Sequence, residues 1–154
     1  MVLILLIAGL LLIRPKPKTF IYGWFAGECV GNCGTMYQAK ENYILRDSIS
    51  YWESDNKNKL LNIRAQQVLE NDHEGSFSYL KLNIPLIMLL DPREQFGCPD
   101  CHDQGGYYLQ FTMLGITRHF KIDKGNEPFY YQNLTRDLNT VMNKTLFEFK
   151  QYGR

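Results

Sequence analysis

Positions 96–111 read F-G-C-P-D-C-H-D-Q-G-G-Y-Y-L-Q-F, a cysteine-rich turn that runs directly into an aromatic strand. Beyond it, Tyr107 to Leu114 and Ile116 to Ile122 are predicted to be two strands that meet at Gly115 in a tight antiparallel hairpin. Flat aromatic rings pack well on a half-buried sheet, and the chain has 10 tyrosines and 9 phenylalanines. This stretch therefore predicts a fold that is built on a sheet.

Upstream of this stretch, the sequence predicts a meander of shorter strands. Thr19 to Ala26 is rich in aromatic residues, and Thr35 to Lys40 resumes strand character. Glu41-Asn42 is a polar pair that can turn the chain into Tyr43 to Arg46. Ile49 to Glu53 is a further short strand candidate because it alternates.

The helical predictions lie further along the chain. Residues 58–71 fit the helical and the strand period equally well, so their structure stays open. A helix is expected to begin near Ser76 or Ser78, either of which could cap it, and Pro85 would end or bend that helix. The end of the chain is predicted to be an amphipathic helix, because one stripe at helical spacing contains Leu134, Leu138, Val141, Met142 and Phe149.

These patterns together predict an α+β fold in a single domain. A chain of 154 residues, 45% hydrophobic and 21% charged, is long enough for one core and too short for two ordinary domains. We expect residues 19–154 to form an antiparallel sheet of about five strands, with helices packed on one face and the C-terminal amphipathic helix among them.

The first 18 residues are predicted to be a targeting segment rather than part of the fold. Met1 to Ile13 is an unbroken apolar run that suits a signal peptide and falls short of the roughly 20 residues needed to cross a bilayer. Arg14 to Lys18, with two prolines, then forms a stiff tether. We expect a signal peptide or membrane anchor, and hence an exported domain in the cell envelope: periplasmic, membrane-anchored or secreted. A buried N-terminal core segment is the alternative.

The four cysteines form two closely spaced pairs in glycine- and proline-containing turns. Cys29 and Cys33 are spaced C-x3-C, and Cys98 and Cys101 are spaced C-x2-C. In an exported domain we favour disulfide bonds, for which four cysteines allow three connectivities. If the two turns are adjacent in space, cross-pairing closes a loop of roughly 70 residues and constrains the unfolded chain by about 4 kcal/mol.

Two other chemistries remain open for the same four cysteines. One is a zinc site made by all four thiolates, in which His102 could replace one of them, provided that the cysteines stay reduced. The other is a redox dithiol at Cys98 and Cys101. A catalytic C-x-x-C usually opens a helix, whereas this one opens a strand, and the carboxylates of Asp100 and Asp103 would raise the thiol pKa.

A polar cluster and a set of aromatic residues are further candidate sites. Asp100, His102 and Asp103 crowd one turn and could bind a cation or act as an acid–base cluster, although Asp near glycine usually forms turns. His119 alternates within a strand and is expected to be a face residue. Aromatic residues at strand spacing are usually core, but they could also line a binding surface. These are Tyr22, Trp24, Tyr37, Tyr51, Trp52, Tyr107 and Tyr108.

Charge and motifs exclude several function classes. The formal net charge is +1, and the lysines and arginines after Lys18 are scattered, which argues against electrostatic binding of nucleic acid. No phosphate-binding loop, G-x-S-x-G or H-E-x-x-H motif occurs, so a standard NTPase or hydrolase is not expected. We predict no catalytic residue and no cofactor other than the alternative zinc. The leading hypothesis is a non-enzymatic envelope domain that binds an unidentified protein or small-molecule partner.

The sequences of both cysteine turns resemble motifs of a known group of proteins. G-E-C-V-G-N-C-G-T-M-Y at 27–37 and F-G-C-P-D-C-H-D-Q-G-G-Y-Y at 96–108 resemble motifs of small exported proteins of Bacteroidota whose activity is uncharacterised. The resemblance implies a compact α+β domain behind a signal peptide or lipoprotein signal, and a helix before Ile84-Pro85. It implies no catalytic residue.

Overall fold

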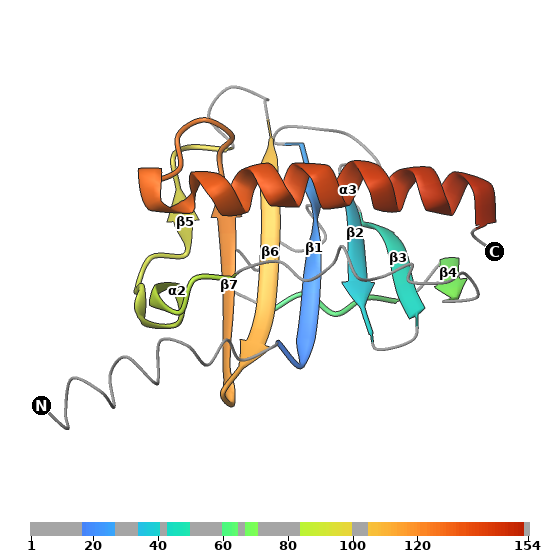
Figure 1. Cartoon of the computed structure of the whole chain (residues 1–154), viewed down its shortest axis with the longest axis horizontal. Coiled ribbons are helices and arrows are strands. Elements are labelled where there is room, and N and C mark those ends of the chain that lie inside the picture. The colour runs from blue at the N-terminus through green and yellow to red at the C-terminus, as the bar shows by residue number, and fades with distance from the viewer. Residues whose placement is uncertain are drawn as a thin grey trace, which may run out of the picture.

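The computed structural model describes residues 17–26, 34–40, 43–49, 60–64, 67–70, 84–99 and 105–152. Within these residues a single sheet of seven strands carries a long helix across one face (Figure 1). The strands are β1 (Thr19–Phe25), β2 (Gly34–Ala39), β3 (Tyr43–Ile49), β4 (Gln67–Glu70), β5 (Gln95–Phe96), β6 (Gly106–Met113) and β7 (Ile116–Ile122). The helices are α2 (Ile87–Leu90), the short 3-10 helix η3 (Phe129–Tyr131) and α3 (Gln132–Tyr152). The predicted α+β class and the C-terminal helix are confirmed.

The strand order β4-β3-β2-β1-β6-β7-β5 corrects the predicted sheet in two ways. The sheet is larger than the expected five strands, and it is not purely antiparallel, because β5 pairs with β7 in parallel. The other neighbouring strands pair antiparallel. β5 escaped prediction because its two residues, Gln95 and Phe96, are too few to show alternation.

Several local predictions need adjustment. β4 at Gln67–Glu70 answers part of the open question in residues 58–71, since it pairs with β3. β3 continues to Ile49, so the first residue of the expected strand at 49–53 belongs to β3, while the rest of that strand lies outside the described residues.

The helix expected from Ser76 or Ser78 also lies outside the described residues. The helix that the structure shows nearby, α2, follows Pro85 instead of preceding it. Pro85 has no N–H to donate, but its carbonyl accepts the N–H of Met88 at 2.9 Å. It therefore precedes a helical turn without disturbing it.

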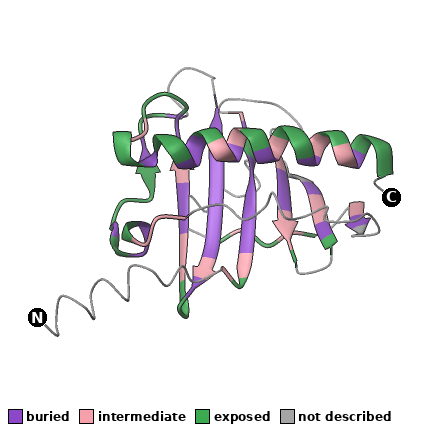
Figure 2. Ribbon diagram, viewed as in Figure 1, coloured by how far each residue is buried: buried purple, intermediate pink, exposed green. Residues whose placement is uncertain are grey.

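The main core lies between α3 and the sheet. Facing residues of adjacent strands meet in register, for example Tyr22 with Leu109 and Leu109 with Phe120. Figure 2 shows buried positions along α3 at intervals, alternating with exposed ones. The buried residues of α3 are Leu134, Thr135, Leu138, Val141, Thr145 and Phe149. Among the described helices, none is both long enough and apolar enough to cross a membrane.

A buried hydroxyl pair fixes α3 over β1. The Thr145 hydroxyl donates its only proton to the carbonyl of Val141 at 2.8 Å, so it can only accept in a second hydrogen bond. The Tyr22 hydroxyl, 2.8 Å from Thr145 Oγ1, must then be the donor of their shared bond. Both side chains are fully buried and satisfied, which holds the helix at one register on the sheet.

The opposite face of the sheet carries a smaller core. It contains Ile21, Phe25, Met36 and Tyr108, with Leu61 and Ile63 packed against it. The segment 60–64 is held over this face by Gln110, which accepts the N–H of Leu61 at 2.8 Å and donates to its carbonyl at 3.3 Å. An irregular segment, rather than a helix, therefore covers this part of the second face.

Candidate functional site

The ends of the two cysteine turns converge at one end of the sheet, where β1 stops and β2 and β6 begin. Phe25, the last residue of β1, pairs with Gly34 on one side and with Gly106 on the other. The first turn therefore leaves and rejoins the sheet beside the point where the second turn enters β6. At that point a Cβ on Gly105 would lie only 2.7 Å from the Cα of Ala26. This is the adjacency that cross-pairing of the cysteines requires.

Cys98 is the one cysteine in the described part of the chain, and it is disulfide-bonded. Its backbone N–H donates to Asp123 Oδ2 at 3.2 Å, and the same oxygen accepts the amide of Asn126 at 2.7 Å. Asp123 thus ties the second cysteine turn to the end of β7. The other predicted site residues lie outside the described residues, so their pairing stays a prediction: Cys29, Cys33, Cys101, Asp100, His102 and Asp103.

A pocket of about 450 Å³ opens at this same end of the sheet, between α3 and the strands. The ends of β1, β2 and β6 form one wall, α3 forms the other, and the loop after β7 closes the side. Gly105, at the entry from the second cysteine turn, belongs to the lining. The lining residues are Trp24, Thr35, Tyr37, Gly105, Gly106, Tyr107, Asp123, Lys124, Asn139, Met142, Asn143 and Leu146.

Aromatic side chains form the sheet side of the pocket. Trp24 faces Thr35 on β2 and Tyr107 on β6 across the ladder, and it is 42% exposed. Tyr37 and Tyr107 also belong to the lining but are almost fully buried, and burial raises the pKa of both hydroxyls. The expectation of core aromatics is confirmed for Tyr22, Tyr37, Tyr107 and Tyr108, whereas Trp24 is an exposed lining residue. Tyr51 and Trp52 lie outside the described residues.

Amide groups line the helix side. Asn139 and Asn143 are one helical turn apart on α3, so they share a face of the helix. The Tyr107 hydroxyl donates to Asn139 Oδ1 at 3.1 Å, which orients this amide with its NH2 group away from the tyrosine. Lys124 and Asp123 carry opposite formal charges, so the lining as a whole is close to neutral.

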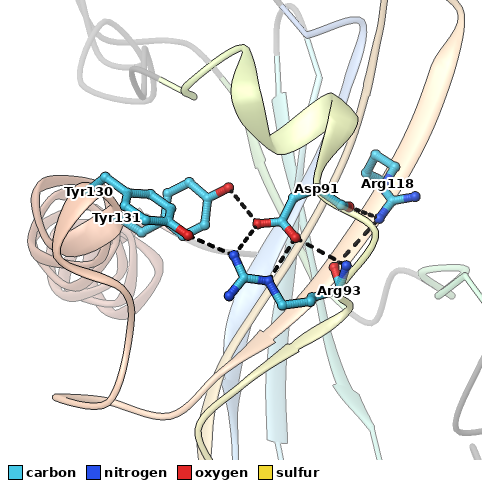
Figure 3. Close-up of polar contacts among 5 residues, drawn as sticks. All are labelled: Asp91, Arg93, Arg118, Tyr130 and Tyr131. Atoms are coloured by element: carbon cyan, nitrogen blue, oxygen red, sulfur yellow. Dashed lines mark hydrogen bonds and ion pairs between the residues drawn. The ribbon is translucent and has the colours of Figure 1, made fainter.

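A second polar cluster lies away from the pocket, where the loop after α2 meets η3 (Figure 3). Asp91 accepts both Nε and Nη2 of Arg93, at 2.9 and 2.6 Å, and the hydroxyl of Tyr131 at 3.0 Å. Arg93 also donates to the Tyr130 hydroxyl at 2.7 Å. Arg118 on β7 donates to the backbone carbonyl of Asp91.

This cluster is a structural clasp rather than a binding site. The carboxylate of Asp91 is 6% exposed and its contacts are to other members of the cluster. Hydrogen bonding from Arg93 is the main reason why the pKa of Asp91 falls to about 2. Burial and the neighbouring carboxylate raise the pKa of Tyr131. The clasp therefore fixes the start of α3 to the edge of the sheet.

The clasp predicts a specific acid sensitivity. Because the folded pKa of Asp91 lies below the unfolded value of about 3.9, its stabilisation is complete above pH ~4 and is lost as the pH falls to about 2. We expect Asp91→Asn to cost about 1–3 kcal/mol at pH 7 and to flatten the fall in stability between pH ~4 and ~2. Urea unfolding of both proteins across this range measures the difference. Parallel acid profiles would contradict this role of Asp91.

His119 is a buried face residue, as its alternation predicted. It lies opposite Gln110 on β6, and its Nε2 is 3.5 Å from a carboxylate oxygen of Glu94. Burial lowers its pKa, Glu94 raises it, and Lys121 and Arg118 lower it further. Among the described residues no group of three or more His, Cys, Asp or Glu side chains could hold a metal ion. The zinc alternative depends mainly on cysteines outside those residues and is still a prediction.

Sequence reasoning missed the helix side of the pocket and the clasp. Asn139 and Asn143 border the apolar stripe of α3 at i, i+4 spacing, a signal that marks a polar pair but does not say what faces it. Asp91 and Tyr131 are 40 positions apart, and nothing local links them. Comparisons with protein-family models, with curated proteins and with solved structures give no match.

Proposed function

We propose that this chain is an exported or membrane-tethered envelope domain that binds a small ligand in the pocket without transforming it. The ligand is uncharged, rich in hydroxyl groups and has one flat apolar face, as a sugar ring has. The observation that carries the proposal is the lining of the pocket, which contains both an exposed tryptophan and two side-chain amides.

The lining matches such a ligand group by group. The ring of Trp24 offers an exposed apolar face on which a ring of similar size can lie. The amides of Asn139 and Asn143 each contain donors and an acceptor, which suits hydroxyl groups that also do both. Lys124 and Asp123 leave the lining with little net charge, and Asp123 is already engaged by Cys98 and Asn126. A charged ligand is therefore less well matched than a neutral one.

Disulfide bonds are proposed to link the two cysteine turns next to the pocket. The bonded state of Cys98 supports disulfide formation. The convergence of the turn ends at Phe25 supports cross-pairing between the two turns. The same convergence would also suit a four-thiolate zinc site in a reducing compartment. Intact mass after thiol alkylation, with and without reductant, together with metal analysis separates the two. Two bonds without metal support the disulfides, whereas four free thiols with one zinc overturn them.

Removing the tryptophan tests the binding proposal. Titration with glucose, galactose, mannose and N-acetylglucosamine, followed by NMR, is expected to show saturable shifts of pocket residues for at least one sugar. Trp24→Ala is expected to weaken that binding about tenfold or more, because it removes the central aromatic contact. Since Trp24 is partly exposed, the variant is expected to stay folded.

Phe147→Ala is the matched control for this titration. Phe147 is another exposed aromatic residue, at 59% exposure, and it follows a lining residue on α3 without belonging to the lining. Its loss is expected to leave the affinity unchanged. Absence of binding for all four sugars at ~10 mM, or equal binding by Trp24→Ala, would overturn the proposal.

A further inference from the structure

The turn between β6 and β7 has an unusual residue at its tip. Leu114 and Gly115 both have positive φ, 54° and 80°, the arrangement of a two-residue turn that normally favours Asn-Gly. A leucine in this left-handed conformation costs about 1–2 kcal/mol. Leu114 is also 69% exposed, so packing within the domain does not offset that cost. A residue that is poor for the backbone and exposed to water points to a contact outside the domain.

Further exposed apolar side chains lie near this tip. Ile116 starts β7 immediately after the turn and is 45% exposed. The short helix α2 lies beside β7 and exposes Ile87 and Leu90. Single exposed apolar residues are common, but Leu114 and Ile116 lie together at the tip and α2 adds two more along β7, which favours an apolar partner.

The N-terminal segment joins the domain at this same end. The N–H of Lys18 donates to the carbonyl of Thr112 at 2.8 Å, two residues before Leu114. Figure 1 shows the start of β1 and the β6–β7 turn together at the lower end of the sheet. The pocket lies at the opposite end of these strands, where Trp24 pairs with Tyr107. The sequence before Lys18 consists of the apolar run that ends at Ile13, followed by Arg14, Pro15, Lys16 and Pro17.

We propose that the tip formed by Leu114 and Ile116 inserts into the surface of an anionic lipid bilayer, next to the N-terminal anchor. The five residues after Ile13 span at most about 18 Å, which keeps the tip within reach of the lipid that the apolar run enters. Basic residues in this linker, Arg14, Lys16 and Lys18, favour anionic headgroups. This inference rests on the membrane-tethered form of the proposed function.

One consequence concerns orientation. With the tip in the lipid, the eight residues of β6 carry the pocket about 25 Å away from the membrane surface, where it faces outward. Anchor and tip together make two attachments, which restrict the tilt of the domain more than a flexible tether alone.

Quenching by bromine-labelled lipid tests the insertion. The full chain is reconstituted into vesicles of phosphatidylcholine and phosphatidylglycerol at about 3:1, with and without brominated acyl chains. The two native tryptophans give a background emission, which is subtracted by measuring the wild-type chain. The additional emission of Leu114→Trp is expected to be blue-shifted and to fall by about half or more in brominated vesicles. In Phe147→Trp, which adds an exposed tryptophan on α3, the added emission is expected to be unquenched.

Each outcome is decisive. A chain that does not float with vesicles overturns both the tether and the insertion, while leaving the sugar-binding test untouched. Flotation without quenching of Leu114→Trp overturns the insertion alone, and equal quenching of both variants overturns the orientation. Leu114→Asn is expected to keep or raise the melting temperature, because Asn suits the turn. A large loss of stability in Leu114→Asn would show that the leucine serves the fold and would also overturn the proposal.

Discussion

Gly105→Ala is expected to destabilise the domain by more than about 4 kcal/mol, although it adds a single methyl group. Gly105 has φ +62°, and a Cβ there would overlap the backbone carbonyl oxygen of Phe25. Backbone cannot move aside at that point without breaking the pairing of β1 with β6. Urea unfolding of the purified variant measures the loss, and binding to the pocket is expected to disappear with it.

Gly125→Ala is the matched control for this substitution. Gly125 also has a positive φ, +88°, but no atom lies within 4 Å of its added Cβ. Only the conformational cost applies there, about 1–2 kcal/mol. If the two alanine variants unfold at the same urea concentration, the close approach of the second cysteine turn to β1 is wrong.

Phe120→Ala is expected to cost about 3–5 kcal/mol, the usual loss for a buried phenylalanine. The ring of Phe120 is fully buried and lies between Phe96 and Phe111, with centroid separations of 5.7 and 6.1 Å. It therefore joins β7 to β5 on one side and to β6 on the other. A fall in melting temperature of about 10 °C is expected for a domain of this size.

Phe129→Ala supplies the comparison on the surface. Phe129 is 81% exposed in η3, so its removal is expected to change the stability by less than about 0.5 kcal/mol. Similar melting temperatures for the two variants would mean that Phe120 does not lie in the core between β5 and β6.

Elements with long regular patterns were predictable from the sequence. β6 and β7 agree with prediction to within one residue because their aromatic and apolar residues alternate on both sides of Gly115. The stripe from Leu134 to Phe149 likewise predicted α3. β5 and α2 have two and four residues, which is too short for any period to show. They form because tertiary contacts hold them, such as the bond from Lys121 N–H to the Glu94 carbonyl at 2.8 Å.

The candidate site was less predictable than the fold. Its cysteine turns stood out in the sequence because of composition and spacing, and Trp24 stood out as an aromatic residue in a strand. The pocket itself arises only when β1, β2, β6 and α3 come together, and each lining residue is ordinary in its local context. Asn139 is an example, since its role depends on a tyrosine 32 positions earlier.

The position of β1 in the sheet has a consequence for how the chain acquires its structure. β1 is made first, yet it pairs on one side with β6, which follows Gly105. Until that later strand is synthesised, one edge of the β1–β3 meander offers unpaired N–H and C=O groups, a hazard for association with other chains. Such long-range pairing folds slowly compared with local contacts. The sheet is therefore complete only when β7 is available, and β7 ends at Ile122 of a 154-residue chain. A factor that keeps the earlier strands apart until then is expected to raise the yield of folded protein.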